Sequence, residues 1–166
     1  MQRFREKNNL FRVAPRPLES TDPYKKGGCI MKKSQIIDLL NKDLTGEIEA
    51  ILIYMRDSFV TPQCRPSREM EEIAKDEMRH AEKLSEMIVD LGGIPSMQHR
   101  ELNFGKGGPK GYLKRLIELE KEAISMYTEH IAAIPDAKIK KLLTHILHEE
   151  EEHLEEFTEQ LRDLGK

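Results

Sequence analysis

Tryptophan is absent from this 166-residue chain, cysteine occurs only twice, and no apolar run is long. Cys29 and Cys64 cannot form a disulfide framework or a Cys-x-x-Cys metal or redox site, and they favour a reducing cytoplasm. No stretch approaches the roughly 20 apolar residues that span a bilayer, so we expect no membrane partner. Near the N-terminus, Arg12 interrupts the apolar pair Leu10 and Phe11, which excludes the apolar core of a signal peptide.

Charge divides the chain into two unequal parts. Residues 1–30 hold seven Lys/Arg and three Asp/Glu among scattered prolines and glycines, whereas residues 31–166 hold 20 basic and 27 acidic residues. We expect residues 1–33 to be a disordered or non-native extension, with Met31 as a candidate start that intact mass would test. Residues 34–166 are long enough for one domain, and their acidity argues against a nucleic-acid partner.

Four segments of the domain place apolar residues at three-to-four spacing, which predicts amphipathic helices. They run from about Ser34 to Val60, from about Ser67 to Leu91, from Pro109 to just before Pro135, and from there towards the end of the chain. The apolar stripe of the first helix is expected to contain Ile37, Leu40, Leu44, Ile51 and Phe59. Pro109 suits a first helical turn, and Gly92 suits a helix end.

The lengths of the connections predict the topology. The first and third connections are short, so each joins two helices into an antiparallel hairpin. Residues 93–108 form a longer link, which could reach roughly 50 Å when extended. A 25-residue helix is about 38 Å long, so this link can run the length of a bundle. We predict an all-α, antiparallel four-helix bundle with one long crossover between the second and third helices.

The two predicted hairpins repeat each other at a shift of 73 residues. The shift superimposes Glu47 on Glu120, Tyr54 on Tyr127, Glu77 on Glu150 and His80 on His153, and it also aligns Ala50/Ala123, Ile51/Ile124, Pro62/Pro135 and Ile73/Ile146. We therefore expect a pseudo-twofold bundle in which the matched polar residues meet near the axis.

Acidic and imidazole side chains interrupt the apolar stripe of every predicted helix. The six interruptions are Glu47, Glu77, His80, Glu120, Glu150 and His153. Burying an uncompensated carboxylate costs several kcal/mol, whereas two divalent cations would neutralise four carboxylates. Each Glu-x-x-His pair puts two ligands on one helix face, and oxygen and imidazole ligands without thiolate suit iron or manganese. We predict two divalent metal ions per chain, iron or manganese. The alternative, that the six residues form only ordinary ion pairs, would require their stripe, spacing and repeat to coincide by chance.

Other polar residues receive smaller roles or none. Tyr54 and Tyr127 lie two turns from Glu47 and Glu120, so we expect core positions near the metals, with a hydrogen-bonding or redox role as a further possibility. Surface positions without a role are expected for four histidines: His99, His130, His145 and His148.

The motifs over roughly residues 34–164 resemble the bacterioferritins, within the ferritin-like superfamily. The first helix contains LNKDLTGEIEAILIYM, with the family's ligand glutamate and a tyrosine seven positions later. The second contains DEMRHAEKL, which is similar to the family's Asp-Glu-Met-Lys-His-Ala, and the link GGIPSMQHRELNFGKG is similar to the family's crossover. The resemblance implies a ferritin-like fold and a ferroxidase centre formed by the six residues, with Glu77 and Glu150 as bridges.

The same resemblance implies further cofactors and partners. Met78 occupies the position of the family's haem-ligating methionine, which implies haem b shared between two subunits. The chain ends thirteen residues after His153, without the short fifth helix that lines the fourfold channels of a bacterioferritin cage. We expect a homodimer or a larger homo-oligomer, and the missing helix argues against a 24-subunit cage.

The function that the resemblance implies is oxidation of Fe(II) to Fe(III) by dioxygen or peroxide, in iron storage and detoxification. Two alternatives stay open: a rubrerythrin-like peroxide reductase and a non-catalytic iron-binding bundle. Rubrerythrins usually add a Cys-x-x-Cys module, which this chain lacks, and an extra glutamate ligand on the third helix. Glu118 and Glu122 are nearby, but neither falls on the inward stripe.

Overall fold

The computed structural model describes residues 31–62 and 65–165, which form four α-helices and no strand. The helices are α1 (Lys33–Val60), α2 (Arg65–Asp90), α3 (Pro109–Ala133) and α4 (Ala137–Asp163). This confirms the predicted all-α class, with boundaries that differ from the expected ones by no more than two residues. The expected disorder of residues 1–30, and Cys64, lie outside the described residues. No helix within the described ranges is long and apolar enough to cross a membrane.

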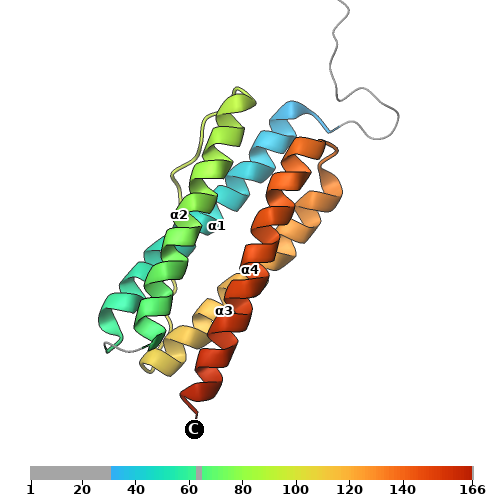
Figure 1. The fold of residues 1–166 in the computed structure, drawn as a ribbon. Coiled ribbons are helices and arrows are strands. Elements are labelled where there is room, and N and C mark those ends of the chain that lie inside the picture. Colours follow the sequence, from blue (N-terminus) through green and yellow to red (C-terminus); the bar gives the residue numbers. More distant parts are fainter. Residues whose placement is uncertain (1–30, 63–64, 166) are drawn as a thin grey trace, which may run out of the picture.

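The helices form the predicted bundle of two antiparallel hairpins (Figure 1). Contacts are most numerous between α1 and α2 and between α3 and α4, and fewer helix contacts join the two hairpins. The link over residues 91–108 leaves the end of α2 and returns along the bundle, so α3 starts at the opposite end and runs parallel to α2 (Figure 1). The long crossover is therefore confirmed.

Local sequence signals explain where the helices begin and end. Gly92 follows α2 with φ of 74°, a left-handed conformation that glycine adopts without a Cβ clash. Pro109 occupies the first turn of α3. Before α4, the side chain of Asp136 accepts hydrogen bonds from the backbone N–H groups of Lys138 and Ile139 at 2.8 and 3.0 Å.

Two apolar clusters fill the bundle, one towards each end. The cluster near the start of α1 is built around Leu40, Leu44, Leu84, Ile88 and Leu143. The cluster near the start of α3 is built around Ile53, Met70, Leu113, Leu116 and Phe157. Burial of these side chains supplies the main driving force for packing the helices, and it leaves a polar layer at mid-length.

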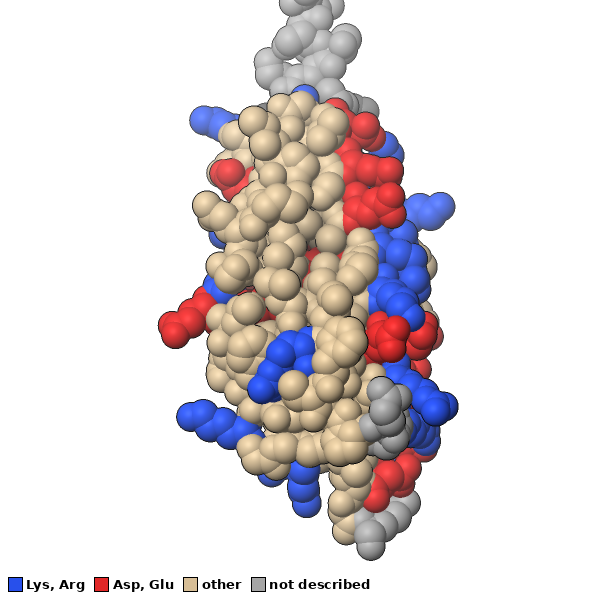
Figure 2. Space-filling model, turned by 90° about the vertical axis from the view of Figure 1, so that its left-hand side faces the viewer, with Lys and Arg blue, Asp and Glu red and all other residues tan. Residues whose placement is uncertain are grey.

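The predicted stripe of α1 is wrong at its C-terminal end. Leu40 and Leu44 are fully buried, whereas Ile37 and Ile51 are half-buried and Phe59 is 79% exposed. Phe59 lies five positions beyond the buried Tyr54, a rotation of about 140° around the helix, so it faces away from the core. The face on the left of Figure 1, seen directly in Figure 2, carries a long band of uncharged residues.

The crossover is attached to the helices by polar contacts. The Asn41 side chain accepts from Ser96 N at 2.7 Å and donates to Ile94 O at 3.3 Å. Further along, Arg100 donates through Nε to the buried carboxylate of Glu49 at 2.6 Å. These contacts hold the link against α1, beside the polar layer.

Candidate metal centre

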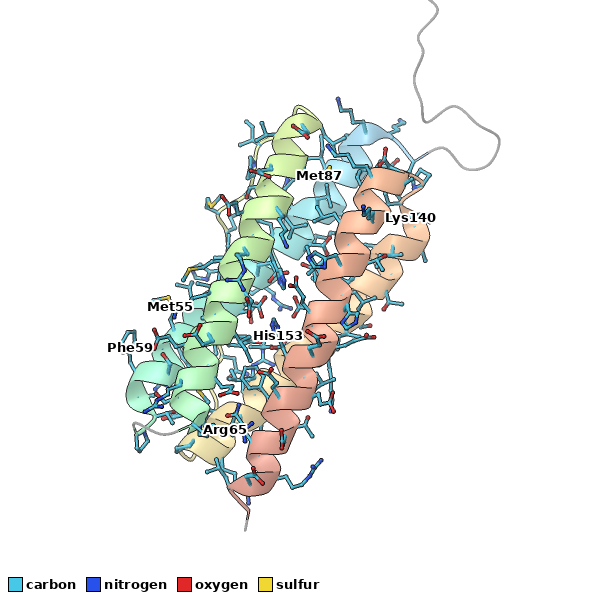
Figure 3. All side chains as sticks on the ribbon, in the orientation of Figure 1. Met55, Phe59, Arg65, Met87, Lys140 and His153 are labelled. Atoms are coloured by element: carbon cyan, nitrogen blue, oxygen red, sulfur yellow. The ribbon has the colours of Figure 1, made fainter. Side chains whose placement is uncertain are left out.

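All four helices contribute to a buried polar layer at mid-length. The layer contains every predicted ligand: Glu47, Glu77, His80, Glu120, Glu150 and His153. None of the six is more than 5% exposed. Figure 3 shows His153 in the space between α2 and α4. The structure therefore brings the six residues together, as the repeat and the stripe predict.

The six side chains form two overlapping groups that are suited to two ions. In each group, one ligand atom per residue lies within 4.8 Å of all the others. One group is Glu47, Glu77, His80 and Glu150; the other is Glu77, Glu120, Glu150 and His153. Each group takes three residues from one hairpin and one from the other, and Glu77 and Glu150 belong to both.

The two histidines turn equivalent atoms towards the centre. His80 Nδ1 lies 2.9 Å from Glu77 Oε2 and 3.0 Å from Glu150 Oε1. His153 Nδ1 lies 3.3 Å from Glu77 Oε1 and 3.7 Å from Glu150 Oε2. Each imidazole therefore contacts a carboxylate of its own helix and one from the other hairpin.

The opposite ring nitrogens face two further acids. His80 Nε2 lies 3.0 Å from Glu149 Oε2, and His153 Nε2 lies 3.7 Å from Asp76 Oδ2. Glu149 and Asp76 match at the shift of 73 residues, and neither was predicted from the sequence to have a role. Asp76 also pairs with Arg79, so its charge is shared. An acid on the outer nitrogen fixes the orientation and tautomer of a ligating imidazole.

The two matched tyrosines hold the two outer glutamates. The Tyr54 hydroxyl donates to Glu120 Oε1 at 2.6 Å, and the Tyr127 hydroxyl donates to Glu47 Oε1. Both rings are fully buried, as predicted. Each tyrosine thus fixes the glutamate of the other hairpin, and the second oxygen of Glu47 lies 3.7 Å from His80 Nδ1.

Burial and mutual repulsion govern the charges of the outer glutamates. Burial, followed by the charges of Glu150 and Glu77, raises the pKa of Glu47 and of Glu120 well above the ordinary value. Burial, followed by the charge of the glutamate that each one contacts, also raises the pKa of Tyr54 and Tyr127. Without metal, protons therefore reduce the negative charge of the centre.

The remaining groups are polarised in the opposite direction. Burial opposes ionisation of Glu150, but the close contacts of its carboxylate with His153 and His80 outweigh burial and lower its pKa to about 2. Burial likewise opposes protonation of His153, yet Glu150 and Glu77 raise its pKa to about 10. The same carboxylates, with Glu47, raise the pKa of His80. The centre is thus a strongly negative site that attracts positive charge, whether protons or metal ions.

Several inward-facing atoms of the centre have no hydrogen-bond partner, so the side chains are better suited to bind metal ions than to bind one another. Glu77 Oε1, Glu150 Oε1 and His153 Nδ1 are buried but make no hydrogen bond of good geometry within the described part of the chain. A buried polar atom without a partner is costly, whereas a bound cation would satisfy all three. Oxygen and imidazole donors without sulfur fit iron or manganese.

Two hollows reach the centre from opposite sides. A cavity of about 610 Å³ between α1 and α3 is lined by Glu47, Glu120 and Glu150 at its inner end. A smaller hollow of about 300 Å³ on the α2 and α4 side reaches His153 and is otherwise lined mostly by carboxylates. Small molecules and ions can therefore approach the buried ligands without unfolding the bundle.

Comparison with known proteins agrees with this geometry. The model of the ferritin-like domain family matches residues 37–166. The chain belongs to the ferritin-like family. Within it, the chain is bacterioferritin-like: it is 30% identical to the bacterioferritin of Desulfovibrio desulfuricans over 144 residues, which cover 81% of this chain and 80% of that protein. The structure of that bacterioferritin, described with a di-iron site in different catalytic states, has a TM-score of 0.75 at 27% identity and covers 80% of this chain and 81% of the other.

Two other proteins show how widely the ferritin-like relatives differ. The bacterioferritin-related protein of Bacteroides fragilis, a dodecameric thioferritin, has a TM-score of 0.75 at 26% identity, covering 81% of this chain and 89% of that one. A 3-demethoxyubiquinol 3-hydroxylase of Pseudomonas aeruginosa is 29% identical over 129 residues, which cover 71% of this chain and 60% of the enzyme. Iron binding at the family level is thus supported, while the reaction differs among relatives.

Beside the centre of this ferritin-like bundle lies a buried pair that was not predicted from the sequence. His130 was expected at the surface, but it is 4% exposed, and its Nδ1 lies 2.7 Å from Oδ1 of the fully buried Asp43. Their positions carried the signal: Asp43 precedes Glu47 by one turn, and His130 follows Tyr127 by three residues, so both share an inward face.

The other histidines and acids lie where the sequence placed them. His99, His145 and His148 are exposed. Glu118 and Glu122 are also exposed and contact Arg115, so they do not join the centre of this ferritin-like bundle. Met78 is 42% exposed on α2.

Proposed function

We propose that this ferritin-like chain is a ferroxidase, which oxidises Fe(II) to Fe(III) with dioxygen or peroxide and serves iron storage and detoxification. The observation that carries the proposal is the pair of overlapping carboxylate and histidine groups, buried in a charged layer with unpaired inward atoms. The similarity to a bacterioferritin with a di-iron site supports it. In balance, two Fe(II) ions each give one electron, and one peroxide molecule takes both with two protons.

The proposed roles follow from each residue's place in the two groups. Glu47 and His80 would hold one iron ion, and Glu120 and His153 the other. Their shared membership supports Glu77 and Glu150 as bridges between the ions. Carboxylates stabilise Fe(III) more than Fe(II), so this ligand set favours oxidation. Tyr54 and Tyr127 would position the outer glutamates through their hydroxyl groups.

Anaerobic titration of the apoprotein with Fe(II), followed by admission of air, tests the proposal. We expect tight binding of about two ions per chain and a rapid rise of near-ultraviolet absorbance. Continued fast oxidation beyond that number would indicate storage. A break at that number would leave a di-iron redox centre, and peroxide turnover with an electron donor would then test the peroxide reductase. Binding without oxidation faster than in free buffer would leave an iron-binding bundle and contradict the ferroxidase.

The proposal includes self-association into a homo-oligomer. Its support is an exposed apolar surface, where Met55 and Phe59 project from the side of the bundle that Figure 2 views directly (Figures 2 and 3). The crossover adds Ile94 and Met97, which are 85% and 69% exposed. The related protein from Bacteroides fragilis is dodecameric. Light scattering coupled to size-exclusion chromatography measures the assembly directly.

Three further predictions remain to be tested. Haem b at Met78 requires a Soret band that disappears in Met78→Leu. Manganese in place of iron would appear in metal analysis of the natively expressed protein. A cytoplasmic location, which the two cysteines favour, stays a prediction.

A further inference from the structure

The first observation concerns Asp43, which the proposed ferroxidase centre does not use. Its side chain lies on α1 one turn before Glu47 and is 0% exposed. One oxygen, Oδ1, is held at 2.7 Å from His130 Nδ1. The other, Oδ2, has no hydrogen-bond partner among the described residues. A buried carboxylate oxygen without a partner lowers the stability of the fold, and a bound ligand at this position would remove that cost.

The second observation is the cavity beside that carboxylate. Asp43 lines the space of about 610 Å³ between α1 and α3, and Glu47, Glu120 and Glu150 line the same space at the proposed iron centre. Small residues in its wall, including Gly46, leave this space unfilled by side chains. A water molecule takes about 30 Å³, so the cavity has space for a cation with its hydration shell.

The third observation is the charge of the cavity. Besides Asp43 and the centre itself, Glu122 and Glu129 lie in its wall, opposed by Arg100 and Lys121. Arg100 is already paired with Glu49 at 2.6 Å and with Glu122 at 3.3 Å. Burial raises the pKa of Asp43, although contact with His130 opposes the rise. The positive charge around the ionised carboxylate therefore does not offset the cost of its burial. The cavity as a whole favours cations.

From these observations, we propose that Asp43 is a ligand of a third divalent-cation site, in which a partly hydrated Fe(II) ion waits before it reaches the dinuclear centre. Histidine contact on one carboxylate oxygen leaves the other oriented for a metal, the pattern in which ligating carboxylates are themselves hydrogen-bonded. Glu47, about 5–6 Å away between Cβ atoms, is the next ligand along α1. The inference deepens the proposed function and rests on it.

The repeat shows that the fold does not need this carboxylate. At the shift of 73 residues, Asp43 corresponds to the fully buried Leu116. A leucine therefore fills the equivalent position of the other hairpin, whereas Asp43 lines the cavity. Burying a carboxylate there costs stability, and cation binding supplies a compensating interaction.

The test is an anaerobic titration of the apoprotein with Co(II), which reports binding by visible absorbance and calorimetry without oxidation. We expect the wild type to bind three ions per chain, the third about tenfold or more weakly, and Asp43→Asn to bind two. Asparagine keeps the volume and can still accept from His130. The matched control is Asp38→Asn on the exposed face of α1, which should bind three. Far-ultraviolet circular dichroism checks that both variants fold.

The outcomes separate this inference from the proposed function. Two ions in the wild type, or three in Asp43→Asn, would overturn the third site and leave the dinuclear centre intact. Fewer than two ions in the wild type would contradict the proposed ferroxidase as well. As a second readout, Asp43→Asn should slow iron loading at limiting Fe(II) about fivefold or more, and an unchanged loading rate would also overturn the waiting site.

Discussion

The hairpins α1–α2 and α3–α4 are alike at the centre of the bundle and differ on either side of it. At the centre, Glu47 and Tyr54 in one hairpin match Glu120 and Tyr127 in the other, and each tyrosine contacts the glutamate of the opposite hairpin. The repeat exchanges the two candidate metal groups, because one takes three residues from α1–α2 and the other takes three from α3–α4. The proposed dinuclear site would place similar demands on both halves, which accounts for the repeat at the centre.

Away from the centre the matched positions diverge. Asp43 and His130 form a buried pair. Their counterparts do not pair with each other: Leu116 is apolar, and Asp57 pairs with Arg56. The difference shows that packing and access can change in one half while the ligands remain fixed. The following variants test how far the two halves are equivalent.

The largest effect is expected at the matched outer glutamates. Glu47→Gln and Glu120→Gln each remove one anionic ligand, so we expect Fe(II) oxidation to slow at least about 100-fold in both. Stopped-flow absorbance measures the rate. The apoprotein should gain stability in denaturant, because a buried carboxylate is removed. Equal losses would support equivalent halves; wild-type rates in either variant would contradict that glutamate's role.

Smaller and unequal effects on metal affinity are expected at Glu149 and Asp76, the two acids that face the Nε2 atoms of the histidines. Glu149→Gln should weaken metal affinity about 10–100-fold, because its carboxylate lies 3.0 Å from His80 Nε2. Asp76→Asn should cost less, since that acid lies 3.7 Å from His153 Nε2 and also pairs with Arg79. Competition with a metal-sensitive dye measures both affinities. Equal losses would show that the distances do not distinguish the two sides.

Without metal, the contacts between hairpins should depend on pH. His153 has its pKa raised from 6.5 to about 10 by contacts that include Glu77 of the other hairpin. Its stabilisation is complete below pH 6.5 and is lost as pH rises towards 10, and the raised pKa of Glu47 and of Glu120 acts in the same direction. Each proton released on unfolding lowers stability by about 1.4 kcal/mol per pH unit.

Denaturant unfolding with a chelator, from pH 6.5 to pH 10, measures this slope. His153→Gln should flatten it, because the variant removes the titrating imidazole. Metal-loaded protein should show a smaller slope, since ligation requires the neutral imidazole. Stability that rises with pH in the apoprotein would contradict the predicted charge state of the centre.

The smallest effect is expected at Gly46, whose counterpart in the second hairpin is Leu119. Gly46→Ala should raise stability by up to about 1 kcal/mol, because alanine favours the helix. The added Cβ would lie 3.3 Å from Met126 Cε, a flexible methionine end that can move. Denaturant unfolding measures the change, and a loss of stability would show that Met126 cannot adjust.

Sequence alone predicted the helices, their connections and the six converging residues, because each depends on local spacing. When a Glu-x-x-His motif lies on the apolar stripe of a helix, the helical period alone places both side chains on the face that points into the core. The pairing of Asp43 with His130 was missed, since it depends on the relative height of α1 and α3. The exposure of Phe59 was missed because apolar spacing alone placed it on the stripe, although it lies about 140° around the helix from the buried Tyr54. The attachment of Arg100 to Glu49 likewise depends on the path of the crossover.

The division of ligands between the hairpins has a consequence for the lifetime of the protein. Each candidate metal group draws on both hairpins, so bound metal would add to the contacts between the hairpins, which are fewer than the contacts within each hairpin. Metal present at 100 times its dissociation constant adds about 2.7 kcal/mol per site to the docked state. Loss of the metal would therefore loosen the junction first and expose the crossover to proteases, so the proposed site would link the abundance of the protein to its metal supply.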